Sequence, residues 1–194
     1  MYDREFNGRT LSFGVSGKLY RNSLIMYDRE TDSLWSHLLG TAVEGPMKGS
    51  MLEMIPSTFT DWATWRRAHP GTLALSPRLS PYGSYGRDAY GGYFASPQTG
   101  ILGTRRKDTR LEDKDLVLGV MAPAAKAYAY RDLREAGKIR DTLAGEPIEV
   151  VYDEEAGTAE AFLIAGGRRE RLPSTPIFWF AWVDFFPGAP LWKG

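Results

Sequence analysis

The feature that most constrains this chain is a β-prone run that leads into Tyr-Asp and then into a polar turn, and it occurs three times. The motif reads MYDRE at residues 1–5 and 26–30 and VYDEE at residues 151–155. Turn-forming residues follow each copy, namely Asn7-Gly8, Thr31-Asp32 and Ala156-Gly157. Asn-Gly is a strong hairpin signal, since both residues accept positive φ. An aspartate at a strand end can accept hydrogen bonds from nearby amides. We therefore interpret the motif as the shoulder of a hairpin and not as a repeated catalytic site.

Breaker residues divide the rest of the chain into many short segments. With 21 glycines and 12 prolines, the pattern favours short antiparallel strands. We expect strands or extended pieces at residues 11–15, 19–27, 34–39, 50–55, 72–76, 117–121 and 126–130, a turn at 145–147 and a helical turn at 132–137. The predicted fold class is β-rich α+β, with an antiparallel barrel or sandwich.

A second recurrence joins two tryptophan-bearing segments with a constant offset of 117 positions. Residues 60–75 align with residues 177–192, and the matching residues are Trp62, Trp65, Pro70 and Gly71 against Trp179, Trp182, Pro187 and Gly188. Aromatic residues three apart share one face of a helix, and Pro-Gly then ends the helix. We expect a single domain over residues 1–194, with an internal repeat of two hairpin-plus-helix units at 1–76 and 117–192. The units are unequal, since residues 14–57 have no counterpart in the second.

Charge and composition argue against several classes of function. Lysine plus arginine number 24, and so do aspartate plus glutamate, so we expect no nucleic-acid partner, which would call for a basic surplus. The absence of cysteine excludes disulfides and thiolate metal sites, and we predict no metal site and no cofactor. The longest apolar run, residues 176–183, is far shorter than the ~20 residues of a membrane span. The N-terminal residues lack the apolar segment of a signal peptide.

Residues 14–18 contain the pattern that most suggests a nucleophile. The stretch GVSGK has neither the spacing nor the strand-to-helix context of a nucleophile elbow, and it lacks the ending of a phosphate loop. Ser16 could still act as a nucleophile with Lys18 or His37 as its base, because residues two apart share one face of a strand. The competing interpretation is a glycine-flanked bulge. His69 is expected at the C-terminal end of a helix.

The segment at residues 80–100 is the loop that most suggests a ligand. It places four tyrosines among glycines around Arg87-Asp88. Tyrosine offers a large rigid contact surface with a polar tip, glycine lets the backbone approach a ligand, and arginine can bind an anion. We therefore expect a pocket for a small polar molecule, with Arg29, Trp35, Arg87 and Tyr90 as contacts. The alternative is a self-packed Ω-type loop.

Several blocks of the sequence resemble a known family over nearly the whole chain. Residues 13–49, YGRDAYGGY at residues 85–93, and residues 117–133, 139–162 and 178–192 are similar to domain-of-unknown-function family 3179. The family pattern has proline at Ala89 and glutamine at His37, which argues against His37 as a general base. Members usually begin with an additional unit similar to residues 117–162 that carries a Cys-Pro-Leu-Cys segment, and this sequence lacks it. The resemblance implies architecture, no established activity, and an extracytoplasmic location.

Three functions stay open at this point. We favour a module that binds a small polar ligand, and the first alternative is a hydrolase with a serine nucleophile. The second alternative is a scaffold or interaction protein, because a missing first unit would leave sheet edges that another chain completes. That alternative predicts a homo-oligomer or a complex formed through open sheet edges.

Overall fold

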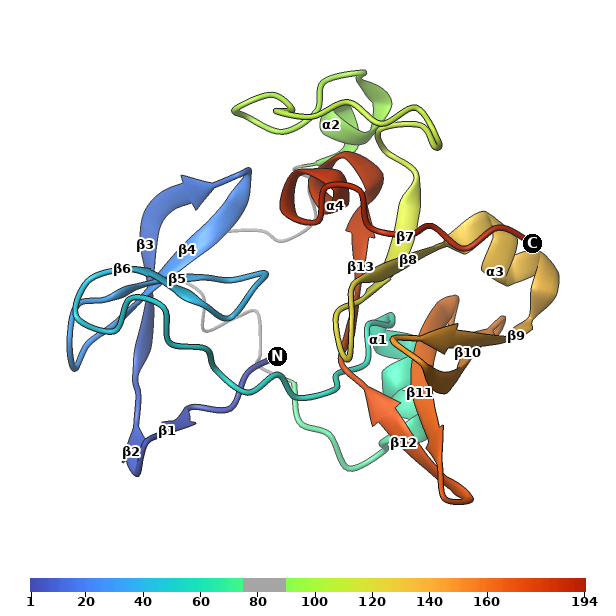
Figure 1. Ribbon diagram of the computed structural model, residues 1–194, viewed down its shortest axis with the longest axis horizontal. Coiled ribbons are helices and arrows are strands. Elements are labelled where there is room, and N and C mark those ends of the chain that lie inside the picture. Colours follow the sequence, from blue (N-terminus) through green and yellow to red (C-terminus); the bar gives the residue numbers. More distant parts are fainter. Residues whose placement is uncertain (75–89) are drawn as a thin grey trace.

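The N-terminal half is an antiparallel sheet preceded by a short hairpin (Figure 1). The structure is a computed structural model and describes residues 1–74 and 90–194. The hairpin joins β1 (Glu5–Phe6) to β2 (Arg9–Thr10), and the sheet contains β3 (Phe13–Tyr20), β4 (Ser23–Asp28), β5 (Leu34–Ser36) and β6 (Ala42–Glu44). Each strand of the sheet pairs with its neighbour in the sequence, as expected of strands joined by short turns.

Two-residue turns fix the first two hairpins. Asn7 and Gly8 have φ of 51° and 74° between β1 and β2, which confirms the Asn-Gly hairpin. Arg21 and Asn22 have φ of 50° and 61° between β3 and β4. The prediction of one strand over residues 19–27 is therefore wrong. Asparagine tolerates the left-handed conformation, and Arg21-Asn22 reverses the chain there.

The C-terminal half contains two antiparallel sheets. One has the strand order β13–β7–β8 and the other β12–β11–β10–β9. Their strands are β7 (Leu116–Val120), β8 (Lys126–Ala129), β9 (Lys138–Leu143), β10 (Glu146–Asp153), β11 (Thr158–Ala165), β12 (Arg168–Leu172) and β13 (Ser174–Phe178). Helix α3 (Tyr130–Ala136) leads from β8 to β9. The expected strand pair at residues 117–130 and the expected helical turn at 132–137 are both confirmed.

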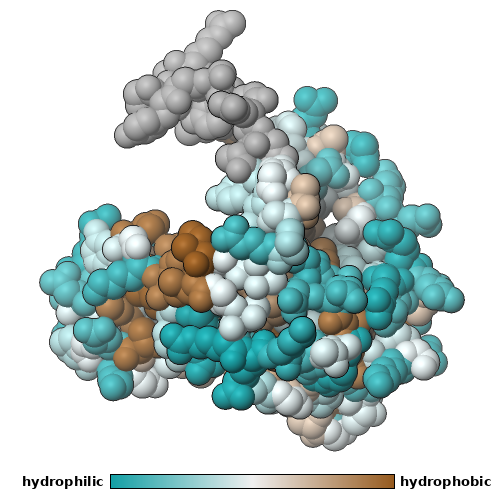
Figure 2. All heavy atoms as spheres, turned by 90° about the horizontal axis from the view of Figure 1, so that it is seen from above, coloured by the Kyte–Doolittle hydropathy of each residue, from teal (hydrophilic) through white to brown (hydrophobic). Residues whose placement is uncertain are grey.

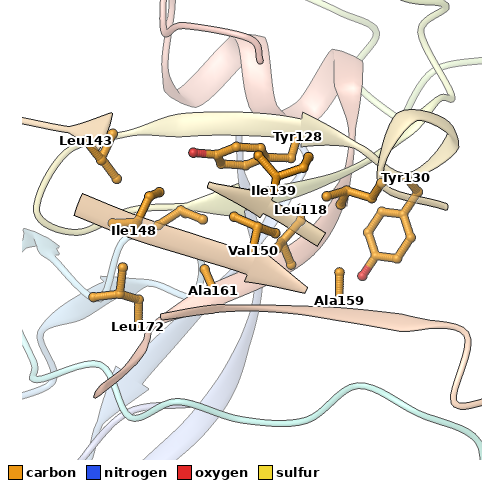
Figure 3. Packing of buried hydrophobic residues seen from close by; sticks show 12 residues of the cluster. Leu118, Tyr128, Tyr130, Ile139, Leu143, Ile148, Val150, Ala159, Ala161 and Leu172 are labelled. Atoms are coloured by element: carbon orange, nitrogen blue, oxygen red, sulfur yellow. The ribbon is translucent and has the colours of Figure 1, made fainter. Parts of the chain in front are cut away.

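These two sheets meet in the largest core of the protein. Leu118 and Tyr128 from β7 and β8 face Ile148 and Val150 of β10 and Ala161 of β11 (Figure 3). Each of the five is at most 1% exposed. Because side chains alternate between the two faces of a strand, one apolar face of each sheet supplies this core.

Helices α1 (Trp62–Ala68), α2 (Gly91–Ala95) and α4 (Trp179–Phe185) lie outside this core. Helix α4 packs over β13 and β7 in a second core, and α1 lies beside β10 and β11 (Figure 1). The N-terminal sheet has a small core of its own around Trp35. Helix α1 contributes no residue to any of the three cores and lies at the edge of the C-terminal half (Figure 1).

The β-rich α+β class is confirmed, but of the two expected architectures, a barrel or a sandwich, no closed barrel is found among the described residues. In the part of the chain that the structure describes, the strands form four antiparallel sheets and none closes on itself. Residues 50–55, expected as a strand or extended piece, contribute only single bridges from Met51 to Thr41 and from Met54 to Tyr2. Single bridges cannot continue a ladder, and a barrel requires a closed ladder. Residues 72–74 are not a strand, and the rest of that expected strand lies outside the described residues.

Some large apolar side chains remain at the surface. Figure 2 shows a hydrophobic patch on the side of the N-terminal sheet, surrounded by hydrophilic residues. Val15, Met51 and Phe59 are each at least 66% exposed. Within residues 1–74 and 90–194, no helix has the length and apolar character needed to cross a membrane. Contiguous exposed apolar surface is a candidate for contact with another molecule.

Candidate functional site

Two of the three Tyr-Asp motifs are shoulders of hairpins, as predicted, because β4 ends at Asp28 and β10 ends at Asp153. The prediction is wrong for the first copy, because Asp3 precedes β1 and does not end a strand. In each copy the aspartate Oδ1 accepts a hydrogen bond from a backbone amide two or three residues further on. The bonds run from Glu5 to Asp3 at 2.9 Å, from Thr31 to Asp28 at 2.6 Å, and from Ala156 to Asp153 at 2.9 Å. The carboxylates shape turns that lie in separate parts of the fold.

Asp28 and Trp35 form the centre of the N-terminal core. Both are fully buried, and Trp35 Nε1 donates to Asp28 Oδ2 at 2.7 Å. Burial alone would raise the pKa of the Asp28 carboxyl, but donors from Trp35, Thr31 and Ser33 hold that pKa below its ordinary value. The structure thus places Trp35, an expected ligand contact, inside the core, where it presents no surface to a ligand.

The remaining expected ligand contacts lie at the surface or outside the described residues. The Arg29 Nη1 donates to the Tyr27 hydroxyl at 3.0 Å, and its guanidinium carbon lies 5.4 Å from the centre of the Tyr27 ring. Tyr90 precedes α2 and is 67% exposed. Arg87 lies outside the described residues. A pocket that joins Arg29, Arg87 and Tyr90 stays a prediction.

Ser16 lies where the register of β3 against β4 shifts, as in a bulge. Its hydroxyl donates to the Ile25 carbonyl at 2.6 Å and accepts from the Lys18 amide at 3.1 Å. His37 follows β5, and β4 lies between β3 and β5. Two strand spacings, about 10 Å, therefore separate the backbones that carry Ser16 and His37. The serine-hydrolase hypothesis gains no support from this geometry and stays a prediction.

The two tryptophan segments have the same local geometry at the offset of 117. Each forms a seven-residue helix that begins at a tryptophan, α1 and α4. The residue that ends each helix has almost the same backbone, with φ −130° and ψ 69° at His69 and φ −123° and ψ 66° at Phe186. The ring of His69 lies 4.0 Å from that of Trp65, and the ring of Phe186 lies 4.2 Å from that of Trp182. The expected helices and the expected position of His69 are confirmed.

The similarity continues upstream of the helices, but the surroundings differ. Pro-Ser-Thr occurs at residues 56–58 and again at 173–175. The second copy leads into β13, which pairs with β7 over five residues. The first copy leads into residues 57–61, which form no strand. Helix α4 buries six residues and α1 buries none. Trp62 is 48% exposed, whereas Trp179, its counterpart, is 1% exposed.

A cleft with a volume of about 360 Å³ separates α1 from the hairpin of β10 and β11. Its walls combine hydroxyls, rings and charges, contributed by Thr58, Thr60, Trp65, His69, Glu160 and Arg169. Mixed apolar and polar linings of this kind are typical of sites for small ligands. The cleft contains both a close, tilted pair of aromatic rings, Trp65 and His69, and side chains of opposite charge.

Hydrogen bonds hold the two walls of the cleft together at its rim. Arg171 donates to Glu160 and, at 3.0 Å, to the Thr58 hydroxyl. Arg67 on α1 pairs with Glu155 at 3.0 Å across the gap. The Thr60 hydroxyl differs, because its oxygen is buried and has no hydrogen-bond partner among the described residues. An unsatisfied buried hydroxyl is costly and is often explained by a missing partner.

Sequence reasoning missed this cleft because its two walls are about a hundred residues apart in the chain. The available signal was the spacing of Trp65 and His69, since residues four apart lie on one face of a helix. Within the described residues, no group of three or more histidine and acidic side chains could hold a metal ion. The chemistry that the cleft offers is hydrogen bonding, ring stacking and charge pairing.

Comparison with known proteins identifies the family. The family described as a protein of unknown function, DUF3179, matches residues 1–165. The match includes the N-terminal sheet, α1 and the strands up to β11. Neither the curated proteins nor the solved structures contain a significant match. This chain therefore belongs to DUF3179, a family whose function is unknown.

Proposed function

We propose that this chain is a binding module in which residues 57–61 receive a β-strand from another polypeptide. The observation that carries the proposal is the contrast between the two tryptophan helices. The helix buries six residues where a strand pairs with the segment before it and none where no strand pairs with residues 57–61 in the described part of the chain. If the two units are a duplication, the first lacks the partner that β7 supplies to the second.

The backbone of residues 57–61 supports this proposal. The amides of Ser57, Thr58, Phe59 and Thr60 have no hydrogen-bond partner among the described residues. Unpaired backbone groups in an extended segment are a template for strand addition. Phe59 is 67% exposed beside them, so an added strand would also bury apolar surface.

A pair of proline substitutions tests strand addition. Pro176 in β13 has no amide and still pairs with Leu118, so the ladder with β7 does not use the amide at this position. Its counterpart is Phe59, and the amides that face the partner in this pattern belong to Thr58 and Thr60. We therefore expect Thr60→Pro to abolish strand binding and Phe59→Pro to weaken it much less, since Phe59→Pro removes apolar contact but no amide that faces the partner.

The probe is a synthetic peptide with the sequence of residues 111–130, which contains β7 and β8. It is chosen because β7 is the strand that pairs with β13, the counterpart of residues 57–61. Binding to the full chain is measured by fluorescence anisotropy. Loss of peptide binding in the Thr60→Pro variant also shows that the peptide binds at residues 57–61. A peptide that instead displaced the chain's own β7 would still bind this variant. Absence of any binding, or equal binding by both proline variants, would contradict the proposal.

A second candidate, the small polar ligand, is favoured by the unpartnered Thr60 hydroxyl in the cleft. A compound with hydroxyl or amide groups and a flat apolar face could bond Thr60 and stack on Trp65. A thermal-shift screen of small polar compounds tests it. The shift should disappear in Thr60→Val and persist in Arg29→Ala and Tyr90→Ala, and the opposite outcome would return the site to the surface residues predicted from the sequence.

A further inference from the structure

We infer that the strand received by residues 57–61 carries a glycine opposite Thr58 and a carboxylate that pairs with Arg66. This inference rests on the proposed function, and it specifies the chemistry of the partner. Two positions of the second unit lead to it, one on β7 and one on α4. Each is transferred to the first unit by the offset of 117 that relates the two helices.

The glycine follows from the space that a tryptophan occupies. In the second unit Thr175 pairs with Gly119, and a Cβ built on Gly119 would lie 2.3 Å from Cζ3 of Trp182. No side chain fits there without displacing the indole. Trp65 is the counterpart of Trp182, and its ring lies close to that of its i+4 neighbour at a similar tilt, 37° for Trp65 and His69 and 34° for Trp182 and Phe186. A strand that pairs with Thr58 therefore meets the Trp65 indole at the same position.

The carboxylate follows from the charge on α1. The counterpart of Arg66 is Val183, which is 5% exposed and belongs to the same buried cluster as Val117 of β7 and Ala127 and Ala129 of β8. Arg66 is exposed, and no ion pair or hydrogen bond of its side chain occurs within the described residues. A partner that covers α1 as β7 and β8 cover α4 would remove the Arg66 guanidinium from water. Burial of that charge is tolerable only with an opposite charge beside it.

The charge on Arg66 therefore predicts that the partner of α1 differs from β7 and β8, which cover α4. The hairpin of β7 and β8 presents apolar side chains to Val183, whereas the partner presents an acid to Arg66. A second copy of this chain has β7 engaged on both edges, between β13 and β8. β7 of a second copy is thus not the occupant, and we assign this place to a partner strand that is apolar and carries a glycine and an acid at these positions.

Variants of the 111–130 peptide test the glycine. We expect the Gly119→Val peptide to bind the full chain at least about tenfold more weakly than the parent peptide, since overpacking costs of this size are usual. The matched control is the Leu118→Val peptide, which also places a β-branched residue in β7 but on the opposite face. If the Gly119→Val peptide binds as tightly as the parent, the glycine requirement is wrong even though strand binding itself stands. If the parent peptide does not bind at all, the proposed function fails first.

A charge cycle tests the carboxylate. Single glutamates are placed in the peptide at position 117, 127 or 129, the β7 and β8 residues that share a buried cluster with Val183. At least one of these peptides should bind the wild-type chain about tenfold more tightly than it binds the Arg66→Val variant, because a close charge pair is lost. The parent peptide should show the reverse order. Preference of every glutamate peptide for Arg66→Val would overturn the inference.

Discussion

The exposure of the two matched tryptophans predicts very different costs for the same substitution. Trp179 is 1% exposed, its Nε1 donates to the Asp108 carbonyl at 2.9 Å, and the Arg110 guanidinium carbon lies 5.0 Å from its ring centre. Truncation of a buried Trp or Phe to alanine costs about 3–5 kcal/mol because a cavity remains. Trp62 is 48% exposed, so its truncation removes about half of a full burial and leaves no cavity, which amounts to about 1 kcal/mol.

Urea unfolding followed by far-UV circular dichroism measures both free energies without dependence on tryptophan fluorescence. If Trp179→Ala does not fold, Trp179→Phe serves as the milder variant and should still cost more than Trp62→Ala. Unchanged m-values for the folded variants would show that stability is what changed. If Trp62→Ala costs as much free energy of unfolding as Trp179→Ala, the outward face of α1 is packed in the isolated chain. The outward face of α1 would then need no partner, and the proposed function would be refuted.

Three other predictions concern the core, the pH dependence and the nucleophile hypothesis. Because the folded-state pKa of Asp28 lies below its unfolded value near 3.9, the ionised carboxylate stabilises the fold above about pH 4, and this contribution is lost as the pH falls through the folded pKa. Asp28→Asn should make the free energy of unfolding depend less on pH between pH 6 and pH 2, as measured by urea denaturation. An unchanged pH dependence would contradict this prediction. Gly119→Ala should lower the free energy of unfolding by about 1–3 kcal/mol through collision with Trp182, whereas Gly71→Ala, with open space around its Cβ, should be near neutral. Ser16, whose hydroxyl already donates to a carbonyl, should resist a fluorophosphonate probe, and labelling mapped to Ser16 would revive the hydrolase hypothesis.

Local signals predicted the local structure well. The Tyr-Asp shoulders at Asp28 and Asp153, the Asn-Gly hairpin and the two tryptophan helices each depend on residues within one turn or one strand, so their geometry follows from nearby atoms. The Arg21-Asn22 turn was missed for a related reason, since its signal is weaker than Asn-Gly and stands inside a β-prone run. The candidate site was harder to find. The ligand contacts expected from composition include Trp35, and its aromatic ring serves the N-terminal core.

The amino-acid sequence by itself determined that residues 62–68 and 179–185 form matching helices with the same backbone at the residue that ends them, because contacts between residues four apart and Pro-Gly turns are short-range effects. Only the tertiary structure decided what each unit does. In one, β7 arrives from a distant part of the chain and buries Trp179. In the other, no described strand arrives, and Trp62 stays half exposed beside an unpaired backbone. Burial depends on which distant segment lies alongside, and that information is absent from any short window of sequence.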